Sequence, residues 1–209
     1  MQSLYHYMDC PSCFKVRLYL AERSIPYQRI TVKRDVPMPE LAGLNPLRRL
    51  PVWMTEDDKP IFGSNTIIDY LESTHEQERL VPDDPVGRAR CWMADELAVE
   101  GLLAPLLVLD REMAGKEPDR WDMKIYRQQS AKITRMLGVF EQLLGGRQWL
   151  VGDRMTVADL SVVLPLTILE RFGLDLAAFA GLSDLRERIV ARPSLAEARQ
   201  DTSSSATGS

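Results

Sequence analysis

Two cysteines separated by two residues are the side chains of this chain best suited to chemistry. They bound the segment Cys10–Cys13, with the sequence CPSC, where a strand-like run gives way to a helical pattern. Unpaired N–H groups and the positive end of the dipole at a helix N-terminus favour thiolate over thiol, so we predict a lowered pKa and a nucleophilic role for Cys10. Cys13, one turn further on, is the candidate resolving or auxiliary thiol. The alternative is that both cysteines are small buried apolar residues.

Two later segments could bind a ligand next to these thiols. Pro51 precedes a strand-like run, and a proline at this place in thioredoxin-like folds is cis, which exposes neighbouring backbone to pair with an extended peptide. We expect Val52 to offer that N–H and C=O. Ser64 opens a helix as its N-cap, and the same helix end could bind a carboxylate. A thiolate, a backbone edge and an anion-binding helix end together fit a short thiol peptide that carries a carboxylate.

The elements that position these residues form a first region in which short strands alternate with helices. Hydrophobic periodicity predicts the order β-α-β-α-β-β-α, which indicates one mixed sheet flanked by helices. The predicted strands are 3–7, 27–32, 52–55 and 61–62, and the predicted helices are a segment that opens at 9–12 and ends near 24–26, then 38–44 and 64–73.

A second region contains only helical periodicity. Its predicted helices lie near 86–115, 119–145, 156–171 and 182–192. We therefore expect an α/β domain over 1–75, a polar, proline-bearing linker over 76–85, an all-helical domain over 86–200 and a disordered tail over 201–209.

Composition narrows the classes of function. The chain has 209 residues, 45% of them hydrophobic, and a formal net charge of -4, which disfavours a generic nucleic-acid binder. No apolar run approaches the roughly 20 residues of a membrane helix, and the first ten residues lack the features of a secretory signal. Three cysteines are too few for a disulfide framework, so we expect a cytoplasmic protein. Cys91, His6 and His75 are too scattered to form a zinc site with the CPSC segment.

Four segments of the chain resemble the glutathione transferase superfamily, and they occur in the family's order. They are LYHYMDCPSCFKVRLYL, LNPLRRLPVW, IFGSNTIIDYLE and LVGDRMTVADLSV, and the likeness extends to about Arg199. The last segment places Thr156 and Asp159 in a helix-capping arrangement. The resemblance implies a thioredoxin-like domain that binds glutathione, a helical domain that offers an apolar pocket to a second substrate, and a homodimer.

The resemblance also assigns roles to individual residues. Cys10 takes the place of the family's nucleophile-activating residue, as in the cysteine-type (omega- and beta-like) classes, which favour glutathione-dependent thiol transfer and reduction over simple conjugation. Val52 would pair with the cysteinyl backbone of glutathione, and Ser64 would bind its γ-glutamyl carboxylate. Arg49 lies where a basic residue often meets the glycyl end. Tyr7 is a further candidate, because some classes hold the sulfur with a tyrosine hydroxyl near the end of the first strand.

Two positions depart from the family pattern. Gly63 stands where the family usually has Glu or Gln to hold the γ-glutamyl end, and Asn65 or an acidic residue from a partner subunit would have to compensate. Arg48 stands where the family's loop usually has glycine, and we interpret it as a solvated surface residue.

The sequence leaves three functions open. The first is a glutathione-dependent transferase that uses Cys10, acts on a small apolar or electrophilic second substrate and needs no metal. The second is a non-catalytic binding or regulatory protein on the same fold, which the departure at Gly63 favours. The third is a reductive dehalogenase or an isomerase on the same scaffold.

Overall fold

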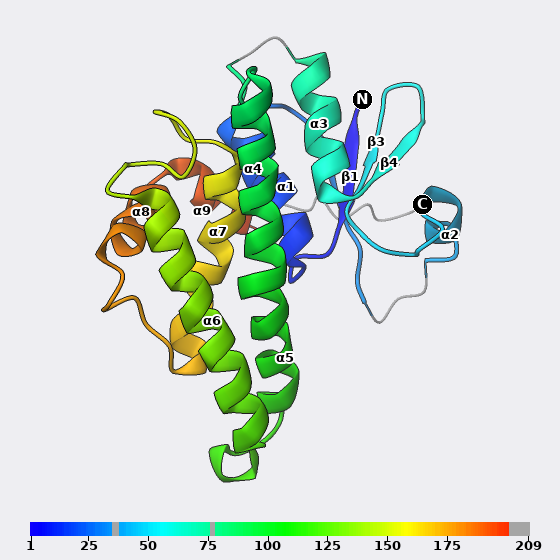
Figure 1. Ribbon diagram of the computed structural model, residues 1–209. Coiled ribbons are helices and arrows are strands. Elements are labelled where there is room, and N and C mark those ends of the chain that lie inside the picture. The colour runs from blue at the N-terminus through cyan, green and yellow to red at the C-terminus, as the bar shows by residue number, and fades with distance from the viewer. Residues whose placement is uncertain (35–37, 76–77, 201–209) are drawn as a thin grey trace. The chain divides into compact units, whose positions relative to one another are not determined.

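The computed structural model describes residues 1–34, 38–75 and 78–200 (Figure 1). The chain forms two compact units. The first contains Met1–Arg79 together with the segment that begins at Arg192, and the second is Leu80–Ala191. The tail predicted over 201–209 and residues 76–77 of the predicted linker lie outside the described residues.

A four-stranded mixed sheet forms the centre of the first unit. Its strands lie in the order β2-β1-β3-β4, and β1 is parallel to β2 whereas the β1–β3 and β3–β4 pairs are antiparallel. The bounds are β1 Ser3–His6, β2 Gln28–Thr31, β3 Val52–Met54 and β4 Pro60–Phe62. With the helices α1 Pro11–Glu22, α2 Leu41–Leu44 and α3 Ser64–Thr74, this order confirms the predicted β-α-β-α-β-β-α region.

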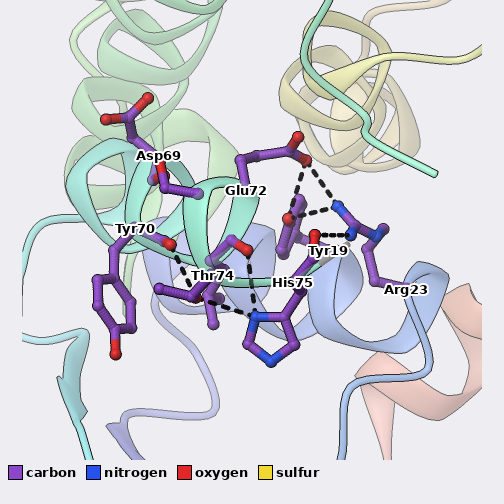
Figure 2. Close-up of polar contacts among 9 residues, drawn as sticks. Tyr19, Arg23, Asp69, Tyr70, Glu72, Thr74 and His75 are labelled. Carbon is purple, nitrogen blue, oxygen red and sulfur yellow. Dashed lines mark hydrogen bonds and ion pairs between the residues drawn. The ribbon is translucent and has the colours of Figure 1, made fainter. Parts of the chain in front are cut away.

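Helix α1 is the most deeply buried helix segment of this unit. Its residues from Cys13 to Leu20 are all buried, so it has no solvent face along its middle. Buried polar contacts tie α1 to its neighbour α3: the Tyr19 hydroxyl donates to Glu72 Oε1 at 2.9 Å, and Arg23 Nη1 lies 2.9 Å from the same oxygen (Figure 2). A charged group at this depth is tolerated because it is paired and hydrogen-bonded.

The last helix of the chain covers another side of α1. Helix α9, Pro193–Arg199, packs against α1, and the Arg192 guanidinium forms two 2.7 Å bonds to the carboxylate of Glu22. Leu195 and Ala198 are buried in this contact region. This segment was expected in a helical domain over 86–200, whereas it groups with the first unit because α9 packs against α1.

The second unit is all-helical, as the periodicity predicts. Its helices are α4 Pro85–Ala98, α5 Ala104–Met113, α6 Met123–Leu144, α7 Val157–Ile168 and α8 Ala180–Val190. The single helix expected over 86–115 is instead interrupted by a π-helical turn, Val99–Leu103, between α4 and α5. Pro105 explains the interruption, since proline lacks the N–H for the bond to the preceding turn and its ring clashes there. Helix α6 packs against α5 and against the π-helical turn, and Figure 1 shows α6 beside α5.

Helix α7 begins with a buried capping box. The Asp159 carboxylate accepts hydrogen bonds from the backbone N–H of Thr156 at 2.8 Å, from its hydroxyl at 3.1 Å, and from the N–H of Leu150 at 2.9 Å. Burial raises the pKa of Asp159 to about 6, although the three hydrogen bonds act in the opposite direction. This one side chain therefore fixes both the start of α7 and the loop before it. Across the described ranges, no helix is long and apolar enough to cross a membrane.

Replacement of Asp159 tests how much its carboxylate contributes to the stability of the fold. Asp159→Ala should lower the free energy of unfolding by about 2–4 kcal/mol, because two buried N–H groups lose their acceptor. Urea denaturation followed by circular dichroism measures the change. Asp153→Ala, at an exposed position of the same loop, is the control and should stay within about 0.5 kcal/mol of the wild type. Equal stability of the two variants would contradict this account.

Candidate functional site

Cys10 occupies the N-cap of α1, where the sequence places it. Its backbone is extended, with φ -87° and ψ 121°, and Pro11 follows as the first helical residue. The Cys10 carbonyl accepts the first helical hydrogen bond, from the N–H of Phe14 at 2.8 Å. Proline suits this first position because its missing N–H would have had no helical partner. The half-buried Cys10 side chain therefore sits next to the free N–H groups of the first turn.

The two thiols differ sharply in acidity. A hydrogen bond from the Cys13 thiol, and then the backbone N–H groups of Cys13 and Ser12, lower the pKa of Cys10 to about 6 against the effect of burial. The same hydrogen bond and burial raise the pKa of Cys13, which is fully buried. These contacts favour the thiolate form of Cys10 and the protonated form of Cys13.

Arg34 adds a positive charge that the sequence analysis missed. It follows β2, its Nε lies 2.8 Å from Asp9 Oδ2, and its guanidinium carbon lies 4.3 Å from the centroid of the Tyr7 ring. Its charge contributes to the lowered pKa of Cys10. Tyr7, predicted as an auxiliary hydroxyl, therefore presents its ring to a cation. No spacing rule links Arg34 to Cys10, because strand pairing brings the two segments together.

The backbone next to Cys10 belongs to Leu50 rather than to Val52. The Leu50–Pro51 peptide bond is cis, and the Cys10 sulfur lies 3.9 Å from the Leu50 carbonyl oxygen. Val52 pairs instead with Tyr5 on β1 and with Phe62 on β4. A residue with strands on both sides has no open edge for a peptide, so the expected role of Val52 fits Leu50 better. The Val52 side chain packs in the apolar cluster beneath the thiols, with Cys13 and Leu50.

The N-cap of helix α3 lies one residue earlier than predicted. Gly63, with φ 89°, is the N-cap and Ser64 is the first helical residue, because a positive φ at the cap suits glycine. No side chain caps this end, so its first N–H groups remain available to an anion. Asn65 is linked to α1 by a 2.6 Å hydrogen bond from Lys15 Nζ to its Oδ1.

The loop before Pro51 is exposed and basic. Arg48 has φ 51°, a left-handed conformation that explains why the family usually has glycine at this position. Arg49 is exposed, and its carbonyl accepts a 2.7 Å hydrogen bond from Nδ2 of the buried Asn45. This bond anchors the loop while the two guanidinium groups face solvent. Among the described residues, no three His, Cys, Asp or Glu side chains gather as a metal site.

Comparison with known proteins identifies this arrangement. The model of the glutathione S-transferase N-terminal domain matches residues 4–79, and that of the C-terminal domain matches residues 112–193. A maleylacetoacetate isomerase of Pseudomonas aeruginosa is 30% identical over 209 residues, covering 93% of this chain and 94% of the relative. The chain belongs to the glutathione S-transferase family.

Other family members resemble the chain over most of its length. A glutathione S-transferase of Methylobacterium radiotolerans, solved in complex with glutathione sulfonate, superposes with a TM-score of 0.80 at 30% identity, over 94% of this chain and 93% of that one. FtsZ-localized protein A of Caulobacter vibrioides is 28% identical over 182 residues, 82% of this chain and 78% of the relative. The superposition confirms the thioredoxin-like and helical architecture of the family.

The asymmetry of the two thiols leads to a test. Cys13→Ala should raise the pKa of Cys10 from about 6 towards its ordinary range, because the largest cause of the lowering is the Cys13 hydrogen bond. The rate of iodoacetamide alkylation against pH, with the label located on Cys10 by mass spectrometry, measures this pKa. Cys91→Ala, which removes another buried thiol, should leave the midpoint unchanged. A midpoint near 6 in Cys13→Ala would show that Cys13 does not control Cys10.

Proposed function

We propose that this family member is a glutathione-dependent enzyme that acts through the Cys10 thiolate in thiol transfer or reduction, in the reducing cytoplasm. The observation that carries the proposal is the position of Cys10 at the N-cap of α1 beside the buried Cys13, a position that lowers the pKa of Cys10. A thiolate at neutral pH is the reactive form in disulfide exchange. All three cysteines are free thiols, which suits a reducing compartment.

The residues around Cys10 fit glutathione by their chemistry. The Leu50 backbone, next to the Cys10 sulfur, would pair with the extended cysteinyl part of the peptide. The uncapped N-terminus of α3, with Ser64, would donate hydrogen bonds to the γ-glutamyl carboxylate. The exposed Arg49 would bind the glycyl carboxylate. Bound glutathione would supply a thiol next to Cys10. Gly63 contributes no side chain, so backbone N–H groups must provide most of the recognition at that end.

The chemistry of Cys10 in this proposal is a thiol–disulfide exchange. The Cys10 thiolate attacks one sulfur of a disulfide substrate, the S–S bond breaks, and the other sulfur leaves as a thiolate that takes a proton from solvent. Cys10 then carries a mixed disulfide with the substrate sulfur. An external thiolate attacks that sulfur, a new disulfide forms between the two, and Cys10 leaves as a thiolate again. We assign the second step to an external thiol because Cys13 is buried and holds its proton.

Isomerisation is a second candidate, and the names of the relatives favour it. The Pseudomonas relative and a mouse relative, 28% identical over 90% of this chain, are both maleylacetoacetate isomerases. An ionised Cys10 argues against a role in which it merely holds a glutathione thiolate, because two negative sulfurs side by side repel. The thiolate therefore favours direct chemistry at Cys10.

A non-catalytic role stays the third candidate, and it requires that Gly63 weakens glutathione binding. FtsZ-localized protein A is a relative whose name describes a location rather than a reaction. Isothermal titration with glutathione separates this candidate from the other two, because an enzyme of this class must bind glutathione at millimolar concentration. Absence of heat at that concentration would favour the binding-protein function.

Cysteine variants test the proposed chemistry directly. Cys10→Ser should lower the rate of glutathione-dependent reduction of a mixed-disulfide substrate by roughly a hundredfold or more, because the nucleophile is lost. Cys13→Ser, whose hydroxyl can still donate a hydrogen bond, should keep the rate within roughly tenfold. Cys91→Ser serves as the control. Full activity of Cys10→Ser would overturn the proposal, and maleylacetoacetate isomerisation that survives in it would favour the second candidate.

We also propose that the chain forms a homodimer through the face between α4 and α6. Two adjoining hollows of about 410 and 500 Å³ lie on this face, and both are lined by Met93, which is 60% exposed, and by Leu97. The larger hollow has Glu96 and Glu100 on its α4 side, and two basic residues, Lys132 and Arg135, on its α6 side. A two-fold axis would bring the acidic edge of one copy against the basic edge of the other.

A charge placed on this face tests the dimer. Met93→Arg should convert a dimer to a monomer in sedimentation-velocity runs, because it buries an unpaired charge in an apolar contact. Val190→Arg, at an exposed apolar position of α8, is the matched control and should stay dimeric. A wild-type monomer at micromolar concentration, or an unchanged dimer in Met93→Arg, would refute this interface.

A further inference from the structure

A second buried arginine of α1 lies close to the reactive cysteine in the fold. The Arg17 side chain is 1% exposed, and its guanidinium donates in several directions at once. Nη1 and Nη2 each donate at 3.1 Å to a carbonyl of the turn before Cys10, those of Tyr7 and Met8 respectively. Nε donates at 2.9 Å to the carbonyl of Ala198 in helix α9.

The fourth contact of this guanidinium is to His6, whose Nδ1 lies 3.0 Å from Nη1. Among the described residues, no carboxylate contacts Arg17, so its charge is balanced mainly by backbone carbonyls. Burial accordingly lowers the pKa of Arg17. A buried charge without an acidic partner is costly, and it depends on geometry that satisfies its donors. Arg17 thus differs from Arg23 on the same helix, which is paired with Glu72.

The two carbonyls that Arg17 holds lie two and three residues before Cys10. The position of the Cys10 sulfur relative to the first-turn N–H groups depends on where this turn enters α1. Those N–H groups are among the groups that stabilise the Cys10 thiolate. A guanidinium that clamps the turn from inside the unit can therefore act on the sulfur without touching it.

We propose that Arg17 is a positioning residue for Cys10, and that it fastens the turn before Cys10 and the C-terminal helix α9 to α1 through one buried guanidinium. The inference rests on the proposed function, in which Cys10 is the reacting group. It also gives α9 a role in the chemistry, because one of the four guanidinium contacts is to its backbone.

Arg17→Lys tests the positioning role. Lysine keeps a basic group of similar length but cannot reach the turn and α9 together, because its amine is a single point on a flexible stem. We expect the pKa of Cys10 to rise by about one unit, which slows alkylation of Cys10 at pH 6 about fivefold. The readout is again the pH dependence of iodoacetamide alkylation, located on Cys10 by mass spectrometry.

Arg23→Lys is the matched control, because it removes a buried guanidinium from the same helix at the end far from Cys10. It should destabilise the fold, as thermal denaturation would show, yet leave the alkylation midpoint of Cys10 in place. Leu195→Ala, which loosens α9 without altering Arg17, should shift the midpoint in the same direction as Arg17→Lys, and it serves if Arg17→Lys does not fold.

The outcomes separate this inference from the proposed function. A wild-type midpoint in the ordinary thiol range would overturn the function assigned to Cys10. A wild-type midpoint near 6 that Arg17→Lys leaves unchanged would overturn the positioning role alone. Equal shifts of the Cys10 midpoint in Arg17→Lys and Arg23→Lys would show that general destabilisation causes the shift. That result would also overturn the positioning role.

Discussion

The acidity of one sulfur depends on the burial of another. The pKa of Cys10 is lowered because the thiol of Cys13, which is buried in the first unit, keeps its proton and donates it in a hydrogen bond to the Cys10 sulfur. This difference in pKa between the two thiols holds only while α1 stays packed against the sheet and its neighbouring helices. The burial of α1 from Cys13 to Leu20 is therefore part of the chemistry of the site, as well as of its stability.

Rigid and variable parts of the site have separate origins. The sulfur and the backbone beside it are fixed by the core, through the apolar cluster that contains Cys13, Leu50 and Val52. The groups suited to the charged ends of a peptide lie at exposed positions, such as Arg49 and the start of α3. In the proposed function, substitutions at the exposed positions can thus change the contacts to the peptide while the Cys10 sulfur keeps its place.

Local sequence signals predicted the fold and the place of Cys10, because the alternation of strands and helices and a proline after the cap are local features. Features that depend on pairing across the sheet were beyond such signals. Strand register decides that the backbone of Leu50, and not that of Val52, lies next to the Cys10 sulfur. Arg34 comes close to Cys10 because β2 lies beside β1. Gly63 can cap α3 because its φ is positive. Glycine tolerates a positive φ, but the presence of a glycine in the sequence does not show that its φ is positive.

The return of α9 to the first unit has a consequence for biosynthesis. The second unit, Leu80–Ala191, interrupts the chain of the first unit. Helix α9 is therefore translated only after the whole second unit. Until then α1 lacks the cover of Leu195 and Ala198 and the partner of Glu22. Met1–Arg79 is therefore translated before the second unit, but helix α1 gains its last neighbour only after the second unit has been translated.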